Sequence, residues 1–492
     1  MKSPPSPPVP SAPAGPQVRP PDVPDPGRWK ALAVVLAAAF LVGLDFFVVN
    51  VSIPSIRATL HATFAEVQLV IASYGLTYAV LLISGGRLGD IYGRKRMFMW
   101  GVVAFTLASL LCGLAPSPIF LIAARAVQGV SGAMLFPQVL SIMQITFPQN
   151  ERAKAFGLFG TVIGTSSFSG NVLGGILVSA DFFGLSWRPI FLINLPIGLL
   201  TVLAAARFLK ESRSPKARRL DLAGVALMTL ALTLLLYPLI QGREAGWPPW
   251  AFACLAAFLP VMVIFVKYEQ RVTASGGSPL VELDLFHDPA FFTGLFSGVC
   301  FFSGAAAFFL IFTIFLQNGI GYSPREAGLT LAWFAIAFLG SSLASMRVQP
   351  RLGSRIISLG AALMMIGLSC LLWRTASSGA ALTGLNLAPI LLVYGTGQGF
   401  VMPTLISTIL INIKGHDAGS AAGVLSTVQQ VSFATGVAVI GTVFFSALGS
   451  LTSVDAFVHA LRVAFSVNIS LLAVTFLLMF KIPRFPAREV HH

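Results

Sequence analysis

Two charged residues lie inside apolar runs, where charge is costly, and they are the first candidates for chemistry. Asp45 falls in the run 31–53, about 22 Å along a helix from Lys30, and Arg125 falls in the run 119–143. Each costs about 2.5–3.5 kcal/mol at the centre of a membrane span, so we expect each to face a partner or an interior cavity. A carboxylate there can load and release a proton, and a purely structural ion pair is the alternative.

A glycine-rich, charged stretch at 85–96 is the second candidate. It lies between apolar runs at 67–84 and 97–115, each long enough to cross a hydrocarbon core as a helix. Its glycines permit two helix ends to approach closely, and its cations favour the cytoplasmic side. Asp90 within it can meet a helix N-terminus or a cation and hold one conformation closed. An ordinary solvated loop is the alternative, but charge bias alone does not require the order Gly-x-Leu-x-Asp-x-x-Gly-Arg-Lys.

The composition is that of an integral membrane protein. Hydrophobic residues make up 56% of the 492, charged residues only 10%, and the mean hydropathy is +0.83, whereas soluble domains carry about 25% charged residues. The long, continuous apolar runs exclude a transmembrane β-barrel. The net charge of +14 does not indicate nucleic-acid binding, because the cations sit in short connectors at helix ends. The four cysteines occur singly, which predicts no metal site.

Fourteen apolar segments are long enough to be spans. They are 31–53, 67–86, 97–115, 119–143, 153–179, 188–209, 221–241, 250–267, 290–317, 325–347, 356–374, 387–411, 418–448 and 461–481. Lys and Arg concentrate in the connectors on the side of both chain ends, which predicts cytoplasmic N- and C-termini in the cell membrane. The Pro-rich residues 1–28 are predicted to form a disordered cytoplasmic tail, and residues 483–492 a second cytoplasmic tail.

An internal repeat divides these segments into two halves. Pro137 and Pro403 are 266 residues apart, and at the same sequence offset Gly129 corresponds to Gly395. Small residues from Ser141 to Gly175 continue the match without a gap. An offset of eight spans relates the halves by an axis along the membrane normal. The predicted divisions are a first six-helix half at 29–210, two extra helices with a linker at 211–288, and a second six-helix half at 289–482.

Several motifs resemble those of one transporter family. The stretch Leu44-Asp45, three residues, then Val49-Asn50-Val51 and Pro54 is similar to the first-helix motif of the fourteen-helix drug:proton antiporters of the major facilitator superfamily. The loop at 85–96, the stretch Arg125–Gly132 and the stretch Trp187–Gly198 also resemble that superfamily. The resemblance implies an all-α integral membrane protein with two pseudo-symmetric six-helix halves and two extra central helices.

The resemblance also implies roles for these residues. Asp45 and Arg125 would couple transport to protons. The loop would be a cytoplasmic latch between the halves, carried by Gly86, Arg87, Gly89, Asp90, Gly93 and Arg94. A motif that marks exporters and bends its helix corresponds to Gly170, Asn171, Gly174 and Gly175. The family's usual Pro is Asn171 and its leading Gly is Ser166, which weakens the inference of export; close helix packing is a second reading of these glycines.

Polar and aromatic residues within the spans are candidates for a substrate cavity, although such groups usually bond to neighbouring helices. They are Asn50, Gln128, Gln138, Trp333, Tyr394, Gln398 and Gln429. With 40 Phe in the chain, the cavity would suit a small hydrophobic or cationic compound. The expected partners are this substrate, protons and the lipid bilayer. No nucleotide-binding loop is present, so a proton gradient rather than ATP or a cofactor would drive export.

Two other functions stay open. The chain could transport a specific metabolite or lipid, since its exporter motif is incomplete. It could be a membrane sensor, but that predicts a sizeable soluble domain, and the longest expected connector is only Glu269 to Pro289. An enzyme is not expected, because the spans hold no clustered His, Cys or paired acids.

Overall fold

The computed structural model describes residues 26–180, 184–214, 221–242, 245–378, 382–415, 417–449, 451 and 453–481. The two predicted tails fall almost wholly outside these residues. The long helices are α1 (Arg28–Leu60), α2 (Phe64–Tyr92), α3 (Arg94–Gly113), α4 (Pro118–Thr146), α5 (Gln149–Ser179), α6 (Pro189–Leu192) with α7 (Asn194–Phe208), α8 (Leu222–Gln241), α9 (Pro249–Ala274), α10 (Pro289–Ile314), α11 (Pro324–Leu352), α12 (Arg355–Ser378), α13 (Gly384–Ile409), α14 (Ala418–Leu448) and α15 (Val454–Lys481).

The described chain contains 13 helices that are long and apolar enough to span a membrane. The remaining predicted segment, 153–179, is also a helix, α5, of 31 residues. A proline divides one span into α6 and α7, because Pro196 has no N–H for the carbonyl of Leu192. The second helix of each half starts with the same signal: Thr63 with Glu66 and Ser323 with Glu326 form capping boxes.

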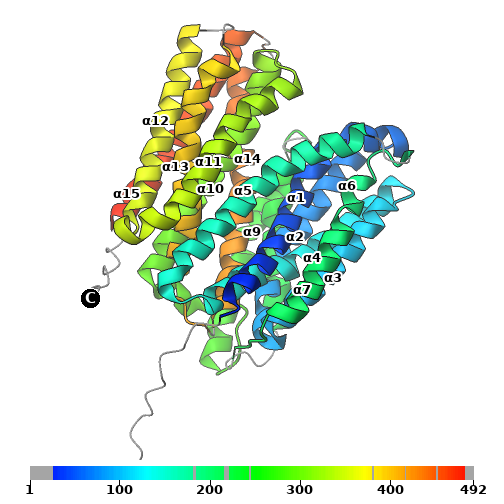
Figure 1. Ribbon diagram of the computed structural model, residues 1–492, viewed down its shortest axis with the longest axis vertical. Helices are drawn as coiled ribbons and strands as arrows, with labels where there is room; N and C mark the ends of the chain where they lie inside the picture. Colours follow the sequence, from blue (N-terminus) through cyan, green and yellow to red (C-terminus); the bar gives the residue numbers. More distant parts are fainter. Residues whose placement is uncertain are drawn as a thin grey trace, which may run out of the picture.

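The helices form two bundles with the same internal pairing (Figure 1). In the first bundle α2 packs against α4, α3 against α4, and α1 against α5. In the second bundle the corresponding pairs are α11 with α13, α12 with α13, and α10 with α14. This shared pattern is the parallel repeat that the 266-residue offset predicts. The fold is therefore all-helical and duplicated, as expected from the sequence.

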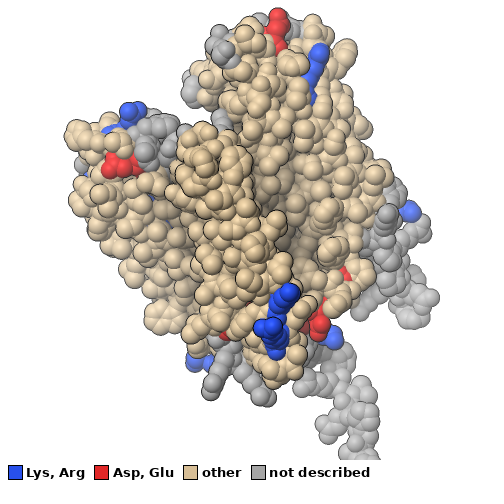
Figure 2. Space-filling model, turned by 180° about the vertical axis from the view of Figure 1, so that it is seen from behind, with Lys and Arg blue, Asp and Glu red and all other residues tan. Residues whose placement is uncertain are grey.

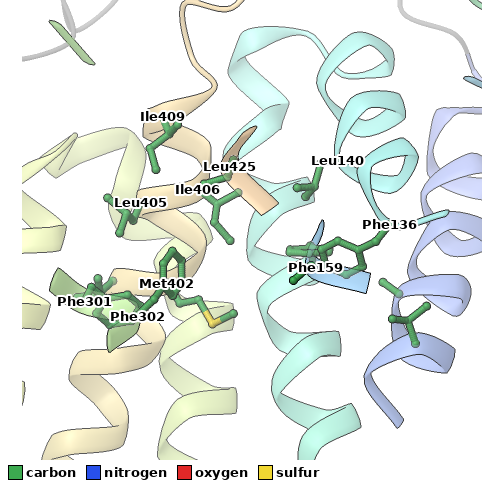
Figure 3. Close-up of a cluster of buried hydrophobic side chains, with 14 of the residues drawn as sticks. Phe136, Leu140, Phe159, Phe301, Phe302, Met402, Leu405, Ile406, Ile409 and Leu425 are labelled. Atoms are coloured by element: carbon green, nitrogen blue, oxygen red, sulfur yellow. The ribbon is translucent and has the colours of Figure 1, made fainter. Parts of the chain in front are cut away.

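The two bundles approach each other at one end only. We call the end where α1 begins and α15 ends the terminal end, and the opposite end the distal end. The ribbons converge at the terminal end and diverge at the distal end, and the space-filling view shows a notch between two lobes there (Figures 1 and 2). Helix α2 contacts α14 and α5 contacts α11 across the boundary. Buried apolar side chains of both bundles face each other near this boundary, including Phe136, Phe159, Ile406 and Leu425 (Figure 3).

The extra pair α8–α9 packs outside the two bundles. Helix α8 contacts α9, α2 and α14. Most of α9 is exposed, as expected for a helix that faces lipid. On the face shown in Figure 2, charged residues gather toward the two ends and leave a broad uncharged band between them.

The stretch 85–96 was expected to be a loop between two spans, but α2 continues to Tyr92 and α3 begins at Arg94, so only Gly93 lies outside a helix. The end of the eighth span was also placed wrongly. Glu269 was placed in a connector, but α9 continues to Ala274, so the connector spans 275–288 and contains a short 3-10 helix at Leu283–His287. The apolar run ends earlier than the helix, because residues 267–271 are polar but include good helix formers.

Candidate functional site

Asp45 and Arg125 form a buried ion pair. Arg125 Nη1 lies 2.6 Å from Asp45 Oδ2, and the two side chains are 0% and 1% exposed. The Arg125 guanidinium also lies 4.2 Å from the ring centroid of Tyr74, which supports the cation from its face. The structure thus brings together the two charged residues that the sequence singled out.

Two side-chain amides complete the surroundings of the Asp45 carboxylate. Gln128 Nε2 and Asn194 Nδ2 each donate to Asp45 Oδ1 at 2.9 Å. Gln128 Oε1 accepts from Arg125 Nη1 at 2.7 Å. Asn194 Nδ2 also donates to Ser109 Oγ at 2.9 Å. We call the set Asp45, Arg125, Gln128 and Asn194 the ion cluster. It ties α1, α4 and α7 together, and α3 through Ser109.

Asn194 was missed as a functional residue by the sequence analysis. It was visible only as a polar residue in the motif Trp187–Gly198, and an amide in an apolar span more often bonds to a neighbouring helix. The structure places Asn194 at the first position of α7, where the span is interrupted, and buries it completely. This position brings its amide to the Asp45 carboxylate.

The charged stretch 85–96 contacts the second half through Asp90, which lies in the last turn of α2. The Asp90 carboxylate, 0% exposed, accepts from the backbone N–H groups of Gly419 at 3.2 Å and Ser420 at 3.1 Å. These are among the first amides of α14, so the carboxylate sits at the positive end of that helix. Arg94 Nη2 lies 2.5 Å from Asp90 Oδ1 and also donates to Gly415 O at 2.7 Å. We call residues 85–96 the latch, because this contact joins the halves at the terminal end.

The glycines of the latch allow this close approach. A Cβ on Gly86 would lie 2.2 Å from the carbonyl oxygen of Gly419, so only glycine fits against α14. Gly89 lies against the side chain of Gln138, and Gly93 has φ +109°, a conformation that favours glycine. The Arg87 side chain is 2% exposed, and its Nη1 lies 3.7 Å from Glu282 Oε1, a partner that the sequence did not indicate.

Further contacts close the terminal end. Gln144 donates to the carbonyl of Leu410, 266 residues away, so positions related by the repeat meet across the boundary. Arg152 Nη1 donates to Ile411 O at 3.4 Å, and Ser342 Oγ donates to Gly157 O at 3.1 Å. Among the described residues, the hydrogen bonds between the bundles all lie in the terminal part of the molecule.

The residues that resemble the exporter motif face the first helix. A Cβ on Gly170 would lie 3.0 Å from Leu44 O, and one on Gly174 would lie 3.1 Å from Val48 O. This is close helix packing beside Asp45. Gly175 is half-buried, and the side chain of Asn171 lies outside the part of the chain that the structure describes.

The candidate cavity residues fall in different environments. Gln128 belongs to the ion cluster, and Gln138 donates to Gly85 O at 2.7 Å behind the latch, so neither faces an open cavity. Tyr394 is 1% exposed and stacks on Phe308 with centroids 4.1 Å apart. The remaining described candidates are the buried Gln398 and the half-buried Trp333 and Gln429. The side chain of Asn50 is not described.

Comparison with known proteins identifies the family. The model of the major facilitator superfamily matches residues 35–437. The chain belongs to the major facilitator superfamily. It is therefore a multi-pass membrane protein of a transporter family, not an enzyme.

Individual relatives of this superfamily member are transport proteins. A probable actinorhodin transporter of Streptomyces coelicolor is 42% identical, with 86% of this chain and 73% of the relative covered. The cephamycin export protein CmcT of Amycolatopsis lactamdurans is 37% identical, with 84% of each chain covered. The crystal structure of the human organic anion transporter MFSD10 matches 92% of this chain with a TM-score of 0.66 at 15% identity, which shows the shared fold.

Proposed function

We propose that this transporter exports hydrophobic or amphiphilic compounds, antibiotics among them, in exchange for protons. The observation that carries the proposal is the ion cluster, in which one carboxylate is held deep in the first bundle by a guanidinium and two amides. Relatives with at least 30% identity are named as antibiotic export and resistance proteins, which supports export and the substrate class.

Protonation of Asp45 would change the forces within the ion cluster. The ionised carboxylate holds Arg125 at 2.6 Å and accepts from Gln128 and Asn194 on its other oxygen. A proton on Asp45 removes the attraction to the guanidinium, which then keeps its bond to Gln128 and its contact with Tyr74. Because the cluster ties α1, α3, α4 and α7, its protonation state can alter how these helices pack.

The proposed orientation places the terminal end in the cytoplasm. The Lys- and Arg-rich connectors lie at that end, as the positive-inside rule requires. The latch and the contacts around Gln144 close this end, so the structure corresponds to a state closed toward the cytoplasm. Export then proceeds by rocking the two bundles about a central site, with the latch released when the cytoplasmic end opens.

A second candidate is export of one specific compound. Some relatives are named for a single compound, such as actinorhodin or cephamycin, while another is named a multidrug resistance protein. If the chain exports one specific compound, a broad panel of lipophilic cations would fail where a single antibiotic succeeds.

The test is substrate-dependent proton movement in liposomes under an imposed pH gradient. The native protein is compared with Asp45→Asn and with Asp284→Asn, a control acid that is 87% exposed. We expect coupled flux in the native protein and the control, and its loss in Asp45→Asn. Equal coupling in Asp45→Asn would show that Asp45 is structural, and absence of flux with every antibiotic tested would contradict the exchange mechanism.

A further inference from the structure

Both linkers that flank the extra helix pair α8–α9 contact the latch. The first strap segment is 211–214, which follows α7, and the second strap segment is 280–282, which follows α9. In the first segment, the carbonyl of Ser212 accepts from the backbone N–H of Arg94 at 2.9 Å, and the backbone N–H of Ser214 donates to the carbonyl of Asp90 at 3.0 Å. The latch is therefore bonded to the inserted part of the chain as well as to α14.

The first strap segment supplies a cap that α3 lacks. Helix α3 has no side-chain cap of its own at Gly93. The Glu211 carboxylate accepts from the backbone N–H groups of Lys95 and Arg96, both at 3.2 Å, where a negative charge is favoured. A Cβ on Gly93 would lie 2.5 Å from this carboxylate, so the glycine makes room for it.

The second strap segment forms an ion pair with the latch. Glu282 lies 3.7 Å from Arg87, and the two side chains are 23% and 2% exposed. The segment is fixed to its own helix, because the fully buried carboxylate of Glu269 accepts from Val281 N–H at 3.1 Å. At the same end Tyr268 of α9 donates to Asp221, the N-cap of α8, at 2.8 Å, so the pair is joined as a unit.

We propose that the extra helix pair holds the two strap segments against the latch. The first segment would stay bound in every conformational state, and the second only in the state in which the terminal end is closed. The first follows α7 in the same bundle as α2 and α3, so Glu211 braces the latch in every state. The second leads directly into α10 of the other bundle, so the Arg87–Glu282 pair must separate when the terminal end opens. This pair is a lock on the closed state. The inference rests on the alternating access proposed above.

The test is hydrogen–deuterium exchange of the full-length protein in lipid nanodiscs. Glu282→Gln is expected to raise exchange in the segment 410–425 by about threefold, the size typical of a partly exposed ion pair. Glu151→Gln is the matched control, because it breaks the ion pair with Arg28 at the same end but within one bundle. It should leave exchange there unchanged. The double variant Arg87→Gln with Glu282→Gln should raise exchange in this segment no more than either single variant does, within experimental error.

Three results would overturn the lock. They are unchanged exchange in Glu282→Gln, an equal increase in Glu151→Gln, and additive effects of the Arg87 and Glu282 changes. The ratio of protons to substrate should stay constant in Glu282→Gln, because the ion cluster is untouched. Absence of proton flux in the native protein would contradict the proposed function but would leave the exchange result as a separate test.

Discussion

Replacing Arg125 by Leu separates the structural from the functional role of the ion cluster. The change leaves the Asp45 carboxylate buried without its guanidinium, and breaking a buried pair costs about 3–5 kcal/mol. The donors Gln128 and Asn194 remain on Asp45 Oδ1, so we expect the lower bound, about 3 kcal/mol. That is about a hundredfold loss in the ratio of folded to unfolded protein.

The double change Arg125→Leu with Asp45→Asn should recover much of this loss, because no buried charge is left unpaired. Unfolding in detergent micelles, followed by tryptophan fluorescence, measures the stability of the single and double variants. We expect the double variant to be more stable than Arg125→Leu and still unable to couple proton and substrate flux. Wild-type stability of Arg125→Leu would refute the reasoning about buried charge. A double variant that couples normally would show that the pair only stabilises the fold.

Three further changes test the latch and the ion cluster. Gly86→Ala places a Cβ 2.2 Å from a backbone carbonyl of α14, so transport in liposomes should fall at least about tenfold; Gly75→Ala, with open space around it in the same helix, should transport normally. Asp90→Asn removes the charge at the α14 N-terminus, so the first amides of α14 should exchange with deuterium about tenfold faster, and unchanged exchange would contradict the latch. Asn194→Leu removes a hydrogen-bond donor from Asp45 and should lower the free energy of unfolding by about 1–3 kcal/mol in the same assay. An unchanged free energy of unfolding would show that the amide is not needed.

Much of the fold could be predicted from the chain alone. Continuous apolar runs reveal spans because each helix must satisfy its own backbone in lipid, which is a local requirement. The 266-residue offset predicted the paired architecture, and it recurs in the contact of Gln144 with Leu410. The predicted segment 153–179 is likewise a helix, α5, which packs against α11 and α13 of the other bundle.

The candidate site was predictable only in part. Asp45, Arg125 and Asp90 stand out because an isolated charge near or within an apolar run is rare and costly. Amides carry no such signal: Gln138 was expected at a cavity but lies behind the latch, and Asn194 was not expected at the site at all. Neutral polar groups bond to whichever helix lies beside them, and the sequence does not name that neighbour.

The sequence by itself determined the membrane spans, the duplication, the charge asymmetry of the two ends and the residues that carry buried charge. These follow from hydrophobicity and charge, which each residue brings wherever it is placed. Only the tertiary structure decided that Asp90 caps α14, that Glu282 faces Arg87 and that the two bundles meet at the terminal end. Such contacts join residues far apart in the chain, and they depend on how the helices pack rather than on any local pattern.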